Sequence, residues 1–434
     1  MRLTIKNLFE IIKFHLFFRK GEQMKILVFG ANGKMGRAVA YDLCKVDEVE
    51  QVGLLGRRRE ALEDAKKWLN SPKTVIHVVD TDDKKALFEA MKGYDVGVST
   101  LPDRHTSYSV VSACVENGLN IVDMLEEYHR RPDLYELEGL VIPQGMTLDE
   151  YGEWIHETAL KNGVTFLDGI GFAPGLSNVT VGQALRKLDK VEWAVARVGG
   201  IPSKKSAEGR PLKYMITWAF SHVLREYNVK LFILKDGKKV EVPALIDREQ
   251  FVFDKFGLNE ELECAVTPGM PSFIYTRPEL KYFAEKTIRW RGHYAGVDTL
   301  KECGILGLDP VDVDGKKVVP REVLLACIEP KLRAKEGDTD VCVMYNTTYG
   351  QLNGKKVCIK HHMWDTPDPS INISSMGRVT GFPAAISAVM IGKGLIKEKG
   401  CVPPEDCIYN ENYDIFDKEL KKRNINILET VEEI

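Results

Sequence analysis

Residues 24–43 carry the feature that most constrains the fold of this chain. The apolar run from Met24 to Phe29 leads into the glycine-rich turn GANGKMG at residues 30–36, and an apolar helical pattern then continues to Leu43. A β-strand that feeds a glycine turn and then a helix is typical of the first unit of a Rossmann dinucleotide-binding domain. The glycines are spaced G-x-x-G-x-x-G and not G-x-G-x-x-G. We therefore predict an α/β fold whose first unit binds a cofactor.

Each glycine of the turn has a separate expected role. Gly30 permits the tight turn, Gly33 lets the backbone approach the pyrophosphate, and Gly36 lets the helix and strand pack closely. The start of the helix then offers unpaired N–H groups and its positive dipole end to the phosphates. The predicted cofactor-binding residues of this turn are Gly30, Asn32, Gly33, Lys34 and Met35. The alternative is that the glycines only turn a loop.

The end of the second predicted strand, residues 50–55, indicates which cofactor to expect. Arg57 stands near the ~20-residue offset past the last glycine at which NAD-binding domains carry an acid that binds the ribose. No acid ends this strand. Arg57, Arg58 and Arg59 follow it, and guanidinium groups bind phosphate oxygens in pairs. We predict NADP rather than NAD, held by Arg57 and Arg58, although a solvated start of the next helix would suit the same arginines.

Three more strands are predicted at residues 74–79, 94–100 and 120–124. Ligands of such sheets bind at the carboxyl ends of the strands. We therefore expect Asp80 to contact the adenine amino group, and Thr100, Leu101 and Pro102 to flank the nicotinamide. The alternative for each is that it is an ordinary loop residue.

The pattern changes in the second half of the chain. A strand at 164–168 opens into GIGFAPGLSN (169–178) and an amphipathic helix to Leu188. From residue 191 the segments are β-rich, with a hairpin turn at 235–237, which favours an α+β domain over a further βαβ series. Residues 378–392 form an apolar, small-residue-rich helical pattern.

From residue 24 onward these motifs resemble, in their order, the saccharopine dehydrogenase family, and most closely its prokaryotic lysine 6-dehydrogenase-like branch. The resemblance rests on residues 30–36, 169–178, 199–202, 211–214, 217–218, 226–227, 287–290, 292–293, 374–376, 380–382 and 402–405. It implies an inserted α+β catalytic and dimerisation domain, a C-terminal helix that returns to the nucleotide domain, and a homodimer. The domains are then expected at 24–150 (Rossmann), 151–373 (α+β) and 374–434 (returning segment). The implied activity is oxidation or reduction of a carbon–nitrogen bond on a lysine-derived amino acid.

The chain also departs from that branch. Lysine 6-dehydrogenase-like members carry a Gly-Leu-Arg-Ser stretch whose arginine suits a substrate carboxylate, whereas residues 269–272 here read GMPS. The alternatives are therefore lysine 6-dehydrogenase activity, a related amino-acid or polyamine reductase, and a non-catalytic nucleotide-binding protein that lost its substrate.

Hydride transfer to or from an imine also needs a group that exchanges the proton of the nitrogen and charges that hold the amino-acid head. Asp123, at a strand end beside the expected nicotinamide, is the first candidate to interact with the amine, and His293, which can titrate near neutral pH, is the second. Tyr214 can donate a hydrogen bond. Asn178, Lys213 and Arg289 are expected to bind substrate. A strand cap, a turn residue and a core aromatic are the structural alternatives for Asp123, His293 and Tyr214.

Composition excludes several other classes. The formal charge of -3 argues against a nucleic-acid binder, and no apolar run reaches the ~18 residues of a membrane span. Nine cysteines without a Cys-x-x-Cys pair fit reduced thiols in the cytoplasm better than disulfides or a zinc site, so no metal is expected. Residues 1–23 are apolar and basic, and we interpret them as an extra helix or a leader outside the mature fold.

Overall fold

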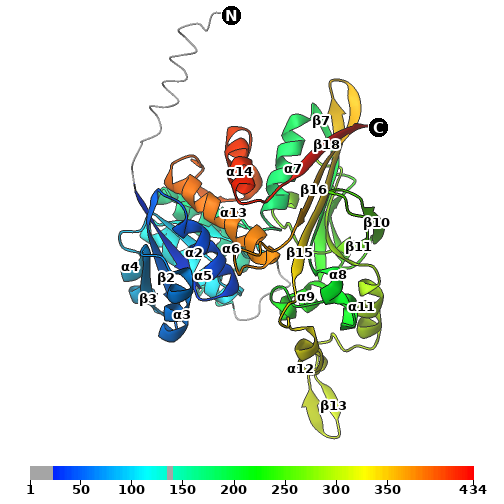
Figure 1. Cartoon of the computed structure of the whole chain (residues 1–434), viewed down its shortest axis with the longest axis horizontal. Coiled ribbons are helices and arrows are strands. Elements are labelled where there is room, and N and C mark those ends of the chain that lie inside the picture. Colours follow the sequence, from blue (N-terminus) through cyan, green and yellow to red (C-terminus); the bar gives the residue numbers. More distant parts are fainter. Residues whose placement is uncertain (1–22, 134–139) are drawn as a thin grey trace, which may run out of the picture.

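The computed structural model describes residues 23–133 and 140–434. Of the expected leader, residues 1–22 lie outside the described residues. The described chain forms two large sheets, seen side by side in Figure 1, with the seven-stranded sheet among the blue and cyan elements. The predicted α/β class, with a Rossmann domain and a second domain of mixed composition, is confirmed.

The first sheet is parallel, with strand order β3-β2-β1-β4-β5-β6-β17. This is the doubly wound Rossmann order extended by one strand, and its winding reverses between β1 and β4, where such folds bind their ligands. The strands are β1 (Met24–Phe29), β2 (Val49–Gly56), β3 (Thr74–Val78), β4 (Val96–Ser99), β5 (Asn120–Asp123), β6 (Thr165–Asp168) and β17 (Gly400–Val402).

Helices cover both faces of this sheet. Side chains of α2, α3 and α13 share one apolar core with the sheet, and those of α4, α5 and α6 share a second core on the other face. The helices are α2 (Lys34–Cys44), α3 (Arg59–Leu69), α4 (Lys84–Met91), α5 (Arg104–Asn117), α6 (Leu148–Lys161) and α13 (Ser375–Gly392). Thr147 and Glu150 form a capping box that starts α6.

The C-terminal part of the chain is divided between the two sheets. Helix α13 is buried along nearly its whole length, and Gly381 lets it approach α2, since a Cβ there would lie 2.9 Å from Cβ of Ala38. Strand β17 pairs with β6 at the edge of the Rossmann sheet. Strand β18 (Leu428–Glu433), however, pairs with β16 in the second sheet. The structure thus differs from the expected boundaries at 150 and 374. Helix α6 packs on the first sheet and β6 pairs within it, whereas β18 pairs within the second sheet.

The second sheet has nine strands and is mixed, with β10-β11-β12-β7-β15-β16-β18 in order and β8 and β9 attached to β12. Its remaining strands are β7 (Lys190–Pro202), β8 (Lys230–Lys235), β9 (Lys238–Pro243), β10 (Glu249–Phe253), β11 (Glu260–Val266), β12 (Tyr282–Trp290), β15 (Asp340–Leu352) and β16 (Lys355–Asp365). The accompanying helices are α7 (Leu176–Lys187), α8 (Lys204–Ala207), η2 (Pro211–Lys213), α9 (Phe220–Glu226), α10 (Phe273–Thr276), α11 (His293–Glu302), α12 (Pro320–Leu332), η3 (Pro404–Asp406) and α14 (Glu411–Lys422).

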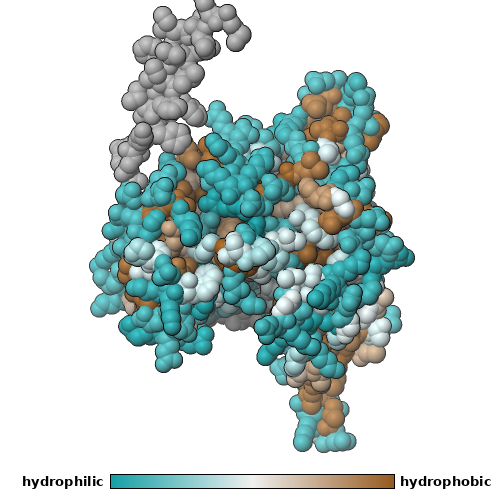
Figure 2. Space-filling view, in the orientation of Figure 1, coloured by the Kyte–Doolittle hydropathy of each residue, from teal (hydrophilic) through white to brown (hydrophobic). Residues whose placement is uncertain are grey.

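A hairpin of β13 (Val311–Val313) and β14 (Lys316–Val318) projects from this domain, at the bottom of Figure 1. In Figure 2 the projecting arm carries brown, apolar surface, and Val311 and Val313 are 48% and 51% exposed. No helix of the described residues is long and apolar enough to cross a membrane.

Candidate active site

One cavity of about 800 Å³ lies between the two sheets. Its first wall is made by the turns that follow β1, β2, β3, β4 and β5, which is the carboxyl edge of the Rossmann sheet. Its second wall is made by β7, β12, α9 and the start of α13. The cavity therefore joins the dinucleotide edge of one domain to the sheet of the other.

The glycine turn after β1 has the geometry that a bound pyrophosphate needs. Gly30 has a positive φ of 77°, and a Cβ at Gly36 would lie 2.3 Å from the carbonyl oxygen of Gly30, so no side chain fits at residue 36. Helix α2 starts after Gly33 without a side-chain cap, which leaves its first N–H groups for a ligand. All five residues predicted from this turn line the cavity: Gly30, Asn32, Gly33, Lys34 and Met35.

Arg57 and Arg58 also line the cavity, directly after β2. Both are exposed, and neither forms an ion pair with a carboxylate anywhere in residues 23–133 or 140–434. Two guanidinium groups without an anionic partner suit the 2′-phosphate that distinguishes NADP from NAD. The chain's own residues thus fit the cofactor.

Exchanging these arginines tests that fit. We expect Arg57→Asp combined with Arg58→Ala to raise the KM for NADPH about 10- to 100-fold, because a charge-assisted phosphate contact is removed and a negative charge added. The KM for NADH should change less than about threefold. Arg59→Ala is the matched control, since Arg59 lies outside the cavity and faces Glu63 at 3.9 Å. If the KM values for NADPH and NADH rose equally, these arginines would not bind the 2′-phosphate and would belong to a solvated helix start.

Of the other predicted cofactor contacts, three line the cavity and one does not. Thr100, Leu101 and Pro102 line the cavity after β4, and the Thr100 hydroxyl donates to the Phe29 carbonyl at 2.8 Å. Asp80 does not line it: its side chain accepts a hydrogen bond from the Asp82 N–H at 3.2 Å and shapes the turn. Its neighbours Val79 and Thr81 reach the cavity instead. The expected contact of Asp80 with adenine therefore has no support in the geometry.

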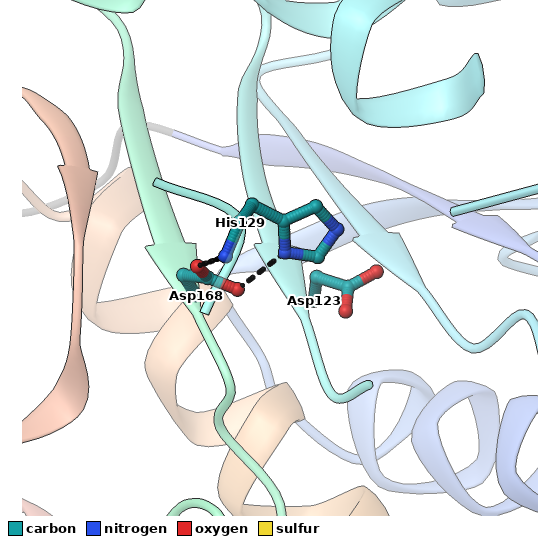
Figure 3. Close-up of side chains that lie close together, drawn as sticks. All are labelled: Asp123, His129 and Asp168. Atoms are coloured by element: carbon teal, nitrogen blue, oxygen red, sulfur yellow. Dashed lines mark hydrogen bonds and ion pairs between the residues drawn. The ribbon is translucent and has the colours of Figure 1, made fainter. Parts of the chain in front are cut away.

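Asp123 belongs to a buried polar cluster with His129 and Asp168, at the carboxyl ends of β5 and β6 (Figure 3). The His129 Nδ1 and the Asp168 Oδ1 lie 2.8 Å apart, and the backbone N–H of His129 donates to the other oxygen of Asp168 at 2.7 Å. The Ser107 hydroxyl donates to Asp123 at 2.9 Å and lies 3.0 Å from the His129 Nε2. Hydrogen bonds within the protein thus occupy the polar atoms that a metal would need.

The cluster acts on the cavity through the backbone. The Leu125 N–H donates to the Asp123 Oδ1 at 2.7 Å, and residues 124–126 line the cavity while Asp123 itself does not. Asp123 is 1% exposed, and burial raises the pKa of its carboxyl. The strand-cap alternative for Asp123 therefore fits the geometry better than direct contact with an amine.

The charge of His129 should make stability depend on pH. Burial lowers the pKa of His129, but the carboxylates of Asp168, Asp123 and Glu127 outweigh it and raise that pKa to about 9. A histidine whose pKa is higher in the folded state stabilises most below its unfolded pKa of ~6.5, and this stabilisation is lost as pH rises through about 9. We expect a loss on the order of 3 kcal/mol over this range, measured by urea unfolding.

Over this range the unfolding free energy of His129→Gln should fall by clearly less than that of the wild type, whereas that of His105→Gln, at a partly exposed histidine that faces Asp82 at 3.1 Å, should fall as the wild type does. A wild-type unfolding free energy that is flat between pH 6.5 and 9 would contradict the charged state of His129.

Arg289 is the only one of the three predicted substrate-binding residues that lines the cavity. Its Nε donates to the Tyr227 hydroxyl at 2.9 Å, and that hydroxyl lies 3.0 Å from the His293 Nε2. His293 Nδ1 in turn lies 2.8 Å from the Leu212 carbonyl, which fixes Nδ1 as its protonated nitrogen. The chain of contacts runs in one direction: His293 accepts from Tyr227, and Tyr227 accepts from Arg289.

This chain corrects the role expected of His293. The imidazole is 1% exposed, and burial together with the Arg289 charge lowers its pKa to about 3, so it stays neutral near pH 7. Tyr214 is also buried outside the cavity, with its ring 5.3 Å from the Arg289 guanidinium. Neither His293 nor Tyr214 lines the cavity, and both lie beside the Tyr227–Arg289 pair.

Asn178 and Lys213 lie elsewhere. The Asn178 Nδ2 donates to Glu405 at 2.9 Å and its Oδ1 accepts from the Gly175 N–H, so its amide joins α7 to the C-terminal segment. Lys213 is exposed and donates to the Arg291 carbonyl at 2.9 Å. Neither lines the cavity.

Three acidic residues that line the cavity were not predicted from the sequence. Glu126, Glu226 and Glu285 line the cavity, and Glu285 is 4% exposed. One signal was available for Glu285: side chains alternate along a strand, so residues 285, 287 and 289 of β12 share the face of Arg289. Glu226, at the end of a short helix, belongs to the 226–227 motif of the resemblance, but no pattern indicated that its side chain lies at the cavity.

A Rossmann sheet, an anion-binding glycine turn, two unpaired arginines and a second domain that closes the cavity define a nicotinamide-dinucleotide-dependent oxidoreductase. Two family models match the chain, the saccharopine dehydrogenase NADP binding domain over residues 26–192 and the saccharopine dehydrogenase C-terminal domain over residues 171–425. The chain belongs to the saccharopine dehydrogenase family, and NADP is its cofactor.

Named relatives are distant but span most of the chain. Saccharopine dehydrogenase (NADP(+), L-glutamate-forming) of Schizosaccharomyces pombe is 20% identical over 81% of this chain and 90% of its own. Carboxyaminopropylagmatine dehydrogenase of Synechocystis sp. is 21% identical over 88% and 92%. The apo saccharopine dehydrogenase (L-Glu forming) structure from Saccharomyces cerevisiae has the same fold, with a TM-score of 0.74 at 19% identity over 94% of this chain and 100% of that one.

Proposed function

We propose that this protein transfers a hydride between NADP and a carbon–nitrogen bond of a lysine-derived amino acid, forming or splitting a secondary amine by way of an imine. The observation that carries the proposal is the cavity between the two domains. It is lined by the glycine turn and Arg57 and Arg58 from the Rossmann domain and by the buried Arg289 from the second domain. A carboxylate held by that guanidinium would fix the amino-acid end of the substrate relative to the nicotinamide.

The chain's own residues would contribute by binding and orientation. NADP, when bound, supplies or accepts the hydride. Tyr227 and His293 hold the Arg289 guanidinium, and Asp123 holds the Leu125 backbone. We propose that His293, Tyr214 and Asp123 act in this indirect way. Leu101 and Pro102 would give the nicotinamide an apolar neighbour that excludes water.

NADPH oxidation with 2-aminoadipate semialdehyde plus glutamate tests the proposal, with lysine plus NADP assayed in the reverse direction. Turnover on one of these pairs would support it. Tight NADPH binding without turnover on any amine and carbonyl pair would favour the non-catalytic alternative.

A second candidate substrate is a polyamine conjugate. Two observations favour it: the similarity to a carboxyaminopropylagmatine dehydrogenase over 88% of the chain, and the acidic residues Glu126, Glu226 and Glu285 that line the cavity. The assay is NADPH oxidation with agmatine and 2-amino-4-oxobutanoate. The homodimer and the cytoplasmic location stay predictions, and light scattering coupled to size exclusion measures the first.

A further inference from the structure

We propose that Glu285 binds a second positive charge of the substrate, so that the substrate carries a carboxylate for Arg289 and an ammonium or guanidinium group for Glu285. This inference rests on the second candidate substrate, the polyamine conjugate, and it assigns a specificity-determining role to a residue of the second wall. It predicts a preference for cationic amines over glutamate as the amine partner.

Glu285 and Arg289 stand four residues apart on strand β12. Glu285 and Arg289 both line the cavity, with Thr287 between them on the same face of the strand. Four residues of extended strand span about 13 Å between Cα atoms. The two side chains thus start four residues apart, which suits a substrate that carries its carboxylate and its cation on different carbon atoms.

The Glu285 carboxyl is fixed by neutral donors. The Thr267 hydroxyl donates to its Oε2 at 2.7 Å, and the Gly269 N–H donates to the same oxygen at 3.0 Å. Gly269 also makes room for it, because a Cβ at that position would lie 2.5 Å from the Glu285 Cδ. Gly269 of the GMPS segment thus holds a carboxyl in the cavity, and Pro271 stands where the resemblance would place an arginine.

No basic side chain contacts the Glu285 carboxyl in residues 23–133 and 140–434, although the Arg289 charge acts on it from a distance. Its Oε1 accepts no hydrogen bond and its carboxyl forms no ion pair in the described parts of the chain. The adjacent Lys286 forms its ion pairs with Asp247 and Glu249 instead. An ionised carboxylate buried without a cation is costly, so a cation from the substrate is the group that would stabilise it.

The groups around Glu285 favour a carboxyl that is protonated in the free enzyme and ionises when a cation binds. Burial and the Glu226 carboxylate on α9 raise the pKa of Glu285, the hydrogen bonds from Thr267 and Gly269 and the Arg289 charge lower it, and the net result is a pKa of about 8. His222 on α9 also lines the cavity. The carboxyl is then largely protonated near pH 7, and binding of an ammonium or guanidinium group should release its proton.

Calorimetry on the NADP-bound enzyme tests the site without turnover, with agmatine as the probe at pH 7 in two buffers of different ionisation enthalpy. We expect the wild type to release close to one proton per agmatine bound. Glu285→Gln should release none and bind agmatine about 30- to 100-fold more weakly. Glu263→Gln is the matched control, because Glu263 is buried on β11, accepts the Tyr294 N–H at 2.8 Å and does not line the cavity.

Steady-state kinetics separates this inference from the proposed function. With agmatine and 2-amino-4-oxobutanoate, Glu285→Gln should raise the KM for agmatine about 30-fold or more and keep kcat within about threefold, while glutamate as amine partner should not become worse. Proton-linked agmatine binding without turnover would keep the site and overturn the proposed function. Turnover with equal loss of kcat for every amine would keep the function and overturn the cation site, since Glu285 would then act in the chemistry.

Discussion

Glu405→Ala is expected to lower the free energy of unfolding by about 3 to 5 kcal/mol, the cost of breaking a buried, fully hydrogen-bonded acid. Glu405 is completely buried in η3, and its carboxylate accepts from the Ser272 and Thr276 hydroxyls at 2.7 Å each and from the Asn178 amide at 2.9 Å. Truncation would leave three donors without their acceptor: the buried Asn178 amide and Ser272 hydroxyl and the half-buried Thr276 hydroxyl. Urea unfolding followed by circular dichroism measures the change.

The exposed Glu336 supplies the control, since Glu336→Ala should change the unfolding free energy by less than about 0.5 kcal/mol. Ser272→Ala should lie in between, at about 1 to 2 kcal/mol, because it removes one hydrogen-bond partner of Glu405. A Glu405→Ala protein as stable as the Glu336→Ala protein would show that this network adds nothing to the contact between the C-terminal segment and α7.

Arg289→Met should reduce kcat/KM with the amino-acid substrate by about 100- to 1000-fold, because the buried cation that holds a carboxylate is lost. The binding of NADPH, which contacts the opposite end of the cavity, should change less than threefold. Stopped-flow fluorescence for NADPH and steady-state assays for the substrate measure the two effects separately.

Tyr227→Phe tests whether Arg289 needs its support. Loss of the 2.9 Å hydrogen bond to Nε should cost about 3- to 10-fold in kcat/KM, well below the effect of Arg289→Met. Comparable losses in NADPH affinity and in substrate turnover for Arg289→Met would point to a folding defect and remove the carboxylate-binding role.

Much of the fold was predictable because the Rossmann half is built from short local signals. The strands expected at 74–79 and 120–124 are β3 and β5, each one residue shorter. The glycine turn constrains the backbone locally, so its five neighbours were placed at the cavity from residue types and spacing alone. The edge strand β17 has three residues, too few for any periodic pattern, and only the whole sheet defines it.

The substrate side was harder because residue type does not reveal the direction of a side chain. Asp123 ends a strand as expected, but the interior location of Ser107 and His129 draws its carboxyl inward. His293 resembles a titrating residue in sequence, whereas contacts with Tyr227 and Leu212 from distant segments bury it in a neutral state. Such contacts join residues 66 and 81 positions apart, beyond the reach of any local pattern.

The division of the Rossmann domain has a consequence for how the chain is made. A ribosome releases β1 to β6 first, yet the helix that covers β4 and β5 and the strand that completes the edge arrive only with residues 375–402. Until then the apolar faces of these strands stay uncovered, so an N-terminal fragment ending near residue 190 should aggregate instead of binding nucleotide. The cofactor site of this protein is therefore finished last, although its glycine turn is translated among the first residues of the fold.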